Sequence, residues 1–183
     1  MKMPLFWMGL ALLLISCSGP QARKPIVRKT SSFMNESIER NKTLNRIENE
    51  VLLRKMSLDS ARTYLNSEHG FWYAYNKRDS LGNYKPKKGD EVFYRHEIRD
   101  LRDSVLYSFE ELGLRSYLVD RQELITGMQQ GIKLMKEGED VTFLFPSHKA
   151  YGYTGSDRIR PNAPLVYQVE LIKINKLSEN END

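Results

Sequence analysis

The side chains that most often carry out chemistry are few and widely separated in this chain of 183 residues. Its histidines, His69, His96 and His148, do not have the spacing of a metal-binding set. The single cysteine, Cys17, leaves no intrachain disulfide and no cysteine-based metal cluster. The sequence therefore argues against a metalloenzyme, a disulfide-bonded scaffold and a thiol protease, and predicts neither a metal nor a cofactor.

Tyr151 is harder to explain by packing than the apolar residues upstream of it. It lies between an alanine and a glycine that mark a turn, and a buried tyrosine hydroxyl needs a hydrogen-bond partner. Leu124 and Ile125 have the periodicity of a helix that faces a core, and Met128 is a common gap-filler in cores. What these side chains do depends on the elements that position them.

Composition places the chain among folded, globular proteins. It is 40% hydrophobic and 28% charged, which is typical of neither a disordered segment nor an integral membrane protein. Its 28 basic and 24 acidic residues are mixed along the chain, so the net charge of +4 does not indicate nucleic-acid binding. The length suits one ordinary domain plus an extension.

The first residues have the pattern of an export signal. Residues 1–16 contain a basic start at Lys2 and an apolar run that is shorter than the about 20 residues needed to span a bilayer. The run ends in Leu14-Ile15-Ser16-Cys17, which resembles the lipobox of bacterial lipoproteins. We expect Cys17 to be lipidated and to hold the protein on a membrane, facing the periplasm. The alternative is an ordinary signal peptide with an incidental cysteine.

The ends of the mature chain are expected to lack a fold of their own. Residues 17–31 are polar and basic, with Pro20 and Pro25, which is typical of a flexible tether. The tether either rests on anionic head groups or is a soluble linker. No aspartate follows Cys17 closely, which favours the outer over the inner membrane. Residues 176–183 are expected to be a disordered tail.

Residues 32–69 are predicted to form a helical arm. The segment from residue 32 to residue 66 has no glycine or proline. A break near residues 57–60 would start a second helix running through Tyr64. We expect the apolar stripe of the arm to pack against its own domain rather than to bind a partner or dimerise. That stripe consists of Leu44, Ile47, Val51 and Leu58, widened by Leu52.

From residue 70 onward the apolar residues recur at the period of strands. A helix is expected at residues 123–136. Short strands around one helix predict an α+β domain with a mostly antiparallel sheet over residues 70–175. The strands are expected at residues 71–75, 92–98, 105–109, 117–119, 141–145 and 165–174.

Three blocks of sequence resemble the FKBP-type prolyl isomerases. They are ELITGMQQGIKLMKEGE at residues 123–139, PSHKAYG at residues 146–152 and IRPNAPLVYQVEL at residues 159–171. Three blocks in the right order are a far more specific signal than one short motif. Together with the lipobox and the arm, they also resemble the gliding-motility-associated FKBP-type lipoproteins of Bacteroidetes.

The resemblance implies a twisted antiparallel sheet wrapped around one short helix, with an N-terminal helical arm before it. It also implies catalysis of rotation about Xaa-Pro peptide bonds, which amide resonance opposes with a barrier of ~18–20 kcal/mol. Rotation forms no covalent bond. It therefore needs an apolar, water-poor pocket with a few hydrogen-bond donors rather than a nucleophile or a metal.

The same resemblance implies which residues form that pocket. Tyr151 would donate its hydroxyl to the carbonyl before the proline, and the Ile125 backbone N–H would bind a second carbonyl. Met128 would lie under the proline ring, where many members carry tryptophan. Tyr167 and Ile159 would close the floor and rim. The remaining substrate-binding residues would be Leu106, Tyr117, Leu124 and either Tyr94 or His96, between which the register does not decide.

Two departures from the family pattern bear on activity. Leu106-Tyr107 stands where the family has Phe-Asp, so the pocket carboxylate is missing, and Arg160 replaces the first of two prolines. We expect a lipid-anchored prolyl isomerase that assists folding or assembly of exported envelope proteins, gliding components among them. Its partners would be proline-containing segments and the membrane, not nucleic acid. The alternative is a catalytically weak or inactive FKBP-like scaffold subunit of an envelope machinery.

Overall fold

The computed structural model of the chain describes residues 30–78 and 82–177. The predicted signal peptide, Cys17 and nearly all of the tether lie outside the described residues, as does the tail beyond Leu177. The chain divides into two compact units, residues 1–39 and residues 40–183. What is described of the first unit is the beginning of helix α2 (Thr30–Leu58), and the second unit contains everything that follows.

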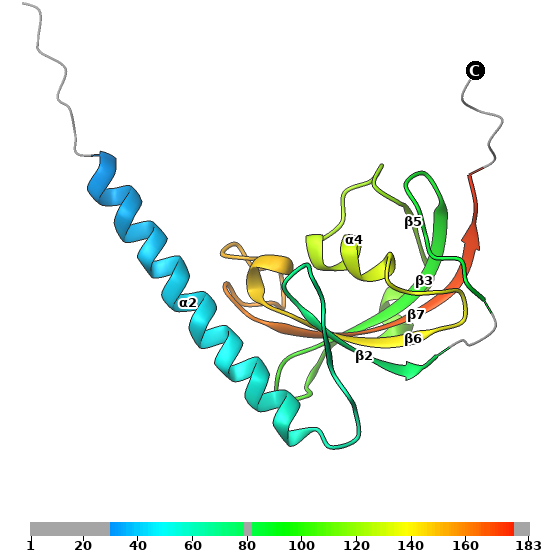
Figure 1. Cartoon of the computed structure of the whole chain (residues 1–183), viewed down its shortest axis with the longest axis horizontal. Coiled ribbons are helices and arrows are strands. Elements are labelled where there is room, and N and C mark those ends of the chain that lie inside the picture. Colours follow the sequence, from blue (N-terminus) through cyan, green and yellow to red (C-terminus); the bar gives the residue numbers. More distant parts are fainter. Residues whose placement is uncertain (1–29, 79–81, 178–183) are drawn as a thin grey trace, which may run out of the picture. The chain divides into compact units, whose positions relative to one another are not determined.

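The described part of the second unit contains one antiparallel sheet with the strand order β1-β2-β6-β7-β3-β4, in which β5 also pairs with β3 (Figure 1). This arrangement confirms the predicted α+β class. The short helices are α3 (Phe109–Leu112), α4 (Thr126–Ile132) and the 3-10 helix η2 (Ser147–Lys149). The strands are β1 (Leu65–Asn66), β2 (Trp72–Lys77), β3 (Glu91–Arg99), β4 (Val105–Tyr107), β5 (Arg115–Leu118), β6 (Asp140–Phe145) and β7 (Leu165–Asn175).

The central pair of strands, β3 and β7, follows the alternation read from the sequence. Val92, Tyr94 and Ile98 are buried on one face of β3. In the ladder, His96 is opposite Val169 and Ile98 is opposite Tyr167. Because paired residues share a face, β3 and β7 present their aromatic and aliphatic side chains together.

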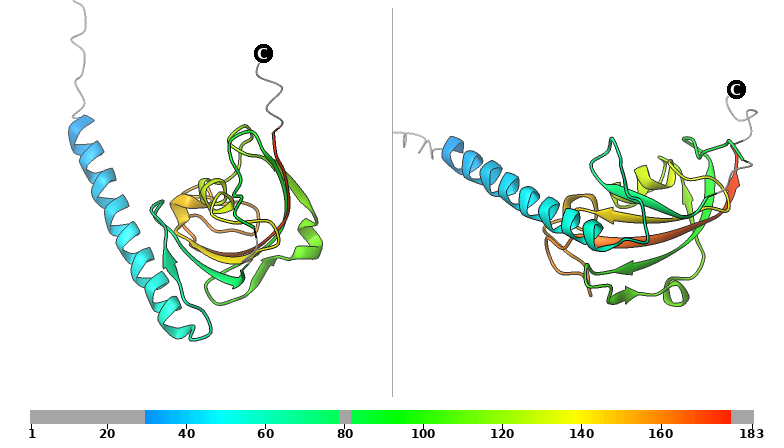
Figure 2. Two further views of the ribbon diagram at one scale, coloured as in Figure 1. Left: turned by 45° about the vertical axis from the view of Figure 1, so that its right-hand side comes forward. Right: turned by 60° about the horizontal axis from the view of Figure 1, so that its bottom comes forward.

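Helix α4 packs closely against the sheet, which curves around it (Figure 2). A Cβ added at Gly127 would lie 2.7 Å from the ring of Phe145 and 2.9 Å from the carbonyl oxygen of Lys149. A glycine is therefore required at this crossing. The rings of Phe71, Phe143 and Phe145 fill the space beneath, with centroids 5.1–5.9 Å apart.

Helix α4 is shorter than the sequence pattern predicted for residues 123–136. Ile125 has an extended ψ of 140° and only precedes the helix. At the other end, the Lys136 N–H donates to the Glu139 carboxylate at 2.8 Å, and the Gly138 N–H donates to Leu171 of β7 at 2.7 Å. The chain leaves the helix because these groups find partners in a turn and in the sheet.

The predicted second helix of the arm is wrong. Beyond Leu58, the Asp59 carboxylate accepts hydrogen bonds from the Ala61 N–H at 3.2 Å, from Arg62 at 2.7 Å and from the Tyr64 hydroxyl at 2.9 Å. A side chain that satisfies nearby donors in this way favours a turn over a helix. The chain then enters β1, which pairs with β2.

The predicted apolar stripe does not identify the buried side of α2. Ile47 and Val51 are 48% and 44% exposed, whereas Leu52 is fully buried against Leu144 and Val166. One turn earlier, Glu48 is only 3% exposed. The pattern of apolar residues did not predict the contact face of α2, because the charged residue Glu48 lies in the middle of that face.

Glu48 is buried because it is fully paired. Its carboxylate accepts hydrogen bonds from the backbone N–H of Ser147 at 2.8 Å and from the Ser147 hydroxyl at 2.6 Å. Bonds of this kind offset the cost of removing a charge from water. They fix α2 to the start of η2.

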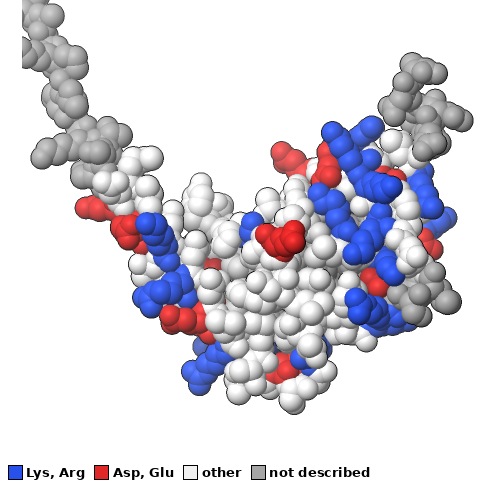
Figure 3. Space-filling model, in the orientation of Figure 1, with Lys and Arg blue, Asp and Glu red and all other residues white. Residues whose placement is uncertain are grey.

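Basic side chains gather at the end of the sheet where β5 and the end of β7 lie (Figure 3). Lys176 and Lys87 lie over the ring of Tyr84, at 4.1 Å and 5.4 Å from its centroid. The buried Asp90 carboxylate accepts from the Tyr84 hydroxyl and from the Leu177 N–H.

Within residues 30–78 and 82–177, no helix combines the length and apolarity that a bilayer span requires.

Candidate functional site

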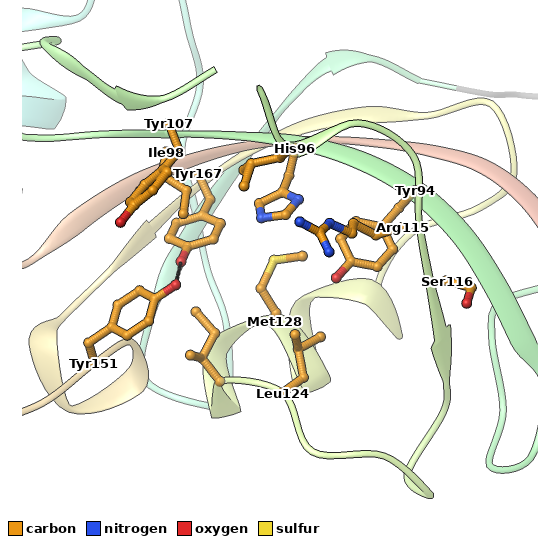
Figure 4. Close-up of a pocket in the computed structure, with 12 residues that line it drawn as sticks. Tyr94, His96, Ile98, Tyr107, Arg115, Ser116, Leu124, Met128, Tyr151 and Tyr167 are labelled. Carbon is orange, nitrogen blue, oxygen red and sulfur yellow. Dashed lines mark hydrogen bonds between the residues drawn. The ribbon is translucent and has the colours of Figure 1, made fainter. Parts of the chain in front are cut away.

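A cavity of about 350 Å³ lies between α4 and the central strands (Figure 4). Seven of the residues that the sequence assigned to a pocket surround it. The lining is Tyr94, His96 and Ile98 of β3, Tyr107 of β4, Leu112 of α3, Arg115 and Ser116 of β5, Leu124, Ile125 and Met128 around α4, Tyr151 after η2, and Tyr167 of β7.

Tyr167 and Met128 give the cavity a buried wall, because each is only 1% exposed. The Tyr167 ring stacks on His96 with 5.8 Å between centroids and meets Phe145 edge-on at 5.3 Å. Such packing leaves the ring one orientation. The wall is therefore rigid and mostly apolar.

Two tyrosine hydroxyls meet at the cavity. Tyr167 donates to the hydroxyl oxygen of Tyr151 at 3.4 Å (Figure 4). Burial first, and then the nearby Tyr151, raise the pKa of Tyr167, so this phenol keeps its proton. Since Tyr151 accepts this bond, its own proton remains available to a ligand.

The loop that carries Tyr151 is held at several points. The Gly152 N–H donates to Ser147 at 2.8 Å, and the Asn162 N–H donates to Gly152 at 2.8 Å. Ser147 is itself held by Glu48 of α2. The position of Tyr151 thus depends on a chain of bonds that begins in the helical arm.

Ile125 contributes a backbone donor at the cavity. It is the residue before the first turn of α4, and no acceptor for its N–H is found in the described part of the chain. The first N–H groups of a helix have no partners within the helix. Leu124 and Ile125 also present half-buried aliphatic side chains beside this donor.

Both residues between which the register left a choice, Tyr94 and His96, line the cavity. Burial first, and then the positive charge of Arg115, lower the pKa of His96 to about 4. Burial raises the pKa of Tyr94 to about 12. Neither group exchanges a proton near neutral pH, so both act through shape and polarity.

Three predicted pocket residues lie elsewhere. Leu106 and Ile159 line a neighbouring cavity of about 390 Å³ together with Arg158. The Arg158 guanidinium lies 4.8 Å from the ring centroid of Tyr107, which lines the first cavity, and donates to the Leu106 carbonyl at 3.0 Å. Tyr117 is buried in the main core, where its hydroxyl accepts from the Asp120 N–H at 3.1 Å.

Five lining residues were missed from the sequence: Ile98, Tyr107, Leu112, Arg115 and Ser116. Ile98 was recoverable, because it continues the alternation of Tyr94 and His96 along β3. Tyr107 was recognised only as the residue at the position of the family's aspartate. The other three carry no periodic signal.

Comparison with known proteins points to one family. Residues 82–172 match the model of the FKBP-type peptidyl-prolyl cis-trans isomerases. The chain is 34% identical over 98 residues to mouse "Peptidyl-prolyl cis-trans isomerase FKBP2", covering 52% of this chain and 69% of that protein. It is 28% identical over 165 residues to the "Probable FKBP-type peptidyl-prolyl cis-trans isomerase FkpA" of Neisseria meningitidis, covering 87% of this chain and 58% of that one.

Solved structures show the same fold. FkpA from Escherichia coli superposes with a TM-score of 0.60 at 20% identity, over 93% of this chain and 81% of that one. A peptidyl-prolyl cis-trans isomerase from Pseudomonas syringae gives a TM-score of 0.59 at 20% identity, over 74% of this chain and 96% of that one.

The chain belongs to the family of FKBP-type peptidyl-prolyl cis-trans isomerases. It spans somewhat more than half the length of its Neisseria relative.

Proposed function

We propose that this protein catalyses cis–trans isomerisation of Xaa-Pro peptide bonds in the cavity beside α4. The observation that carries the proposal is the combination of a buried apolar wall with two available donors, the Tyr151 hydroxyl and the Ile125 N–H. Family membership supports the same reading.

The chemistry follows from the amide bond. A planar amide is stabilised by resonance that separates charge, and rotation removes this resonance. The twisted amide is therefore less polar, and a pocket poor in water favours it over the planar form. Met128 and Tyr167 supply apolar contact for the proline ring, while Tyr151 and Ile125 hold the flanking carbonyls and fix the peptide during rotation.

A proline-peptide isomerisation assay coupled to chymotrypsin tests the proposal on the chain without its signal peptide. Uncatalysed exchange takes about 10–100 s, so catalysis appears as a faster phase whose rate rises in proportion to protein concentration. Binding of the peptide without any acceleration would reject the enzyme and favour a scaffold.

A non-catalytic binding or scaffold role is the second candidate. The specific observation behind it is the pocket lining itself, which contains no carboxylate and has Met128 at the position of the family's common tryptophan. Such a protein would hold proline-containing segments of an envelope machinery without turning them over.

We further propose that a lipid on Cys17 holds the protein at the periplasmic side of a membrane, and that this is the outer membrane rather than the inner one. Its clients would be exported envelope proteins. The lipobox-like Leu14-Ile15-Ser16-Cys17 supports the anchor. A role in gliding motility rests on the sequence resemblance to Bacteroidetes lipoproteins.

Cys17→Ser tests the anchor. The variant should incorporate no radioactive palmitate and should leave the membrane fraction, because lipidation needs the thiol. Labelling equal to that of the wild-type protein would reject the lipoprotein assignment.

A further inference from the structure

The cavity contains a cation that the proposed reaction does not use. Arg115 extends from β5, and Figure 4 shows its guanidinium directed toward His96 and beside Tyr94. None of the cavity's lining residues is acidic. No carboxylate among the described residues forms an ion pair with Arg115.

Other cations near the cavity are engaged. Arg158 pairs with Glu111 at 2.8 Å, so its charge is offset. Arg95 lies over the ring of Phe109, 5.6 Å from the centroid. Of these three arginines, Arg115 is the one that lines the cavity and has no described partner.

The charge of Arg115 reaches the neighbouring side chains. After burial, it is the second cause that lowers the pKa of His96, and it also acts to lower the pKa of Tyr94. His96 remains neutral at pH 7, so it neither adds to this charge nor cancels it. The cavity is consequently electropositive on the side of β5.

We propose that the pocket prefers substrates with an acidic side chain next to the proline, and that Arg115 is the residue that recognises it. This specificity rests on the proposed function, because it concerns the peptide bound in the same cavity. In Figure 4, Tyr151 and Arg115 lie on opposite sides of Met128. A peptide whose proline lies over Met128 and whose carbonyl meets Tyr151 therefore extends toward the guanidinium, which binds a carboxylate through two parallel N–H donors.

Matched peptides test this preference. Glu, Gln and Lys are placed in turn before and after the proline. Isomerisation is followed by NMR exchange, because a coupling protease could itself respond to the charge of the peptide. Glu and Gln differ in charge but hardly in shape. For a partly exposed ion pair we expect kcat/KM to favour Glu over Gln roughly two- to fivefold at one of the two positions. The ratio should approach one at about 1 M salt.

Variants assign the preference to one residue. Arg115→Gln should bring the Glu/Gln ratio to one, and Arg115→Glu should favour Lys instead. Arg54→Gln removes the same charge from an exposed position on α2 outside the cavity lining, and it should keep the wild-type ratio. Circular dichroism of each variant verifies the fold.

Two results would overturn the proposal. One is a Glu/Gln ratio of one or less at both positions in the wild-type protein, and the other is a preference for Glu that survives Arg115→Gln. If the wild-type protein isomerises none of the peptides, the proposed enzyme fails, and the same ratios are measured as dissociation constants by NMR titration. Absence of peptide binding in that titration would overturn the Arg115 assignment as well.

Discussion

The hydroxyl of Tyr151 can be removed without emptying the pocket. Tyr151→Phe keeps the ring and deletes one donor, and a neutral hydrogen bond contributes about 0.5–1.5 kcal/mol. We predict that kcat/KM falls roughly 2- to 12-fold. The matched control is Tyr153→Phe, which deletes a hydroxyl two residues away on a side chain that is 85% exposed. Equal activity of both variants would remove Tyr151 from the mechanism.

His96 should make folding sensitive to mild acid. Its pKa is about 4 in the folded protein against 6.5 ordinarily, because burial and then Arg115 disfavour the charged ring. The unfolded chain therefore binds a proton between pH 6.5 and 4 that the folded chain does not bind. The free energy of unfolding should fall by roughly 3 kcal/mol across this window as the pH is lowered.

Urea denaturation at several pH values measures this slope, and His96→Gln should reduce it. Part of the dependence of stability on pH should remain, because the pKa of His148 is also lowered, by burial and then by the charge of Lys149. Asp59 and Asp90 act in a different window. Hydrogen bonds hold their pKa values below 3.8 against the opposing effect of burial, so their contribution is lost only below about that pH. A His96 titration near pH 6.5 by NMR would contradict the prediction.

Sequence reasoning located pocket residues where a short motif fixes the position. The order of the three blocks placed Ile125, Met128, Tyr151 and Tyr167 around one cavity. It failed for Ile159, which lines a neighbouring cavity together with the preceding Arg158, whose guanidinium lies over Tyr107. It also missed Arg115, because an exposed charged residue on an edge strand gives no sign in the sequence that it lines a cavity.

At the scale of elements, the packing of α4 against the sheet requires the absence of a side chain at Gly127. In a helix, alanine is more favourable than glycine by about 0.8–1.0 kcal/mol. At residue 127 a Cβ would meet Phe145 at 2.7 Å and the backbone oxygen of Lys149 at 2.9 Å, so packing outweighs propensity. Gly127→Ala should lower the free energy of unfolding by about 1–3 kcal/mol.

Gly131→Ala is the matched control for that measurement in urea. The three atoms nearest to its added Cβ all belong to the Phe143 ring, at 3.0–3.4 Å, and a ring can shift where a backbone oxygen cannot. The loss should be smaller than at Gly127. A Gly127→Ala variant more stable than the wild-type protein would show that α4 is not pressed against β6.

β3 was predictable because one of its faces is buried, which alternation records in the sequence, and β6 because it is buried on both faces and has a continuous apolar run. The contact face of α2 was not, because it depends on Glu48 and on its partner Ser147, 99 residues later. A carboxylate reads as exposed unless its partners are known. The break near residues 57–60 was predicted, but the second helix expected after it does not form, since Asp59 satisfies donors that such a helix would have used.

At the scale of the whole molecule, these contacts bear on where the folded domain starts. The sequence pattern places its beginning at residue 70, yet Leu52 is buried against Leu144, and β1 begins at Leu65. We predict that a fragment of residues 40–183 is as stable as the chain from residue 18. A fragment of residues 67–183 should lose at least about 2–5 kcal/mol, the cost of deleting one buried leucine.

Urea denaturation of the two fragments, with Leu52→Ala in the longer one as a control, measures this difference. Leu52→Ala should account for part of the loss without shortening the chain. Equal stability of the two fragments would instead support a domain that begins near residue 70.

The buried contact of Leu52 with Leu144 and Val166 also determines what the tryptophan fluorescence of the protein reports. Trp72 packs there against Leu52, Leu144 and Val166, and the sequence has one other tryptophan, Trp7, within the predicted signal peptide. The tryptophan fluorescence of the chain without its signal peptide therefore comes from Trp72 alone, where α2 meets the sheet. Its emission should shift to the red when α2 separates from β6 and stay constant when a peptide enters the cavity, where methionine stands in place of the family's common tryptophan. Arm docking thus has a built-in optical probe, and ligand binding must be followed by another signal.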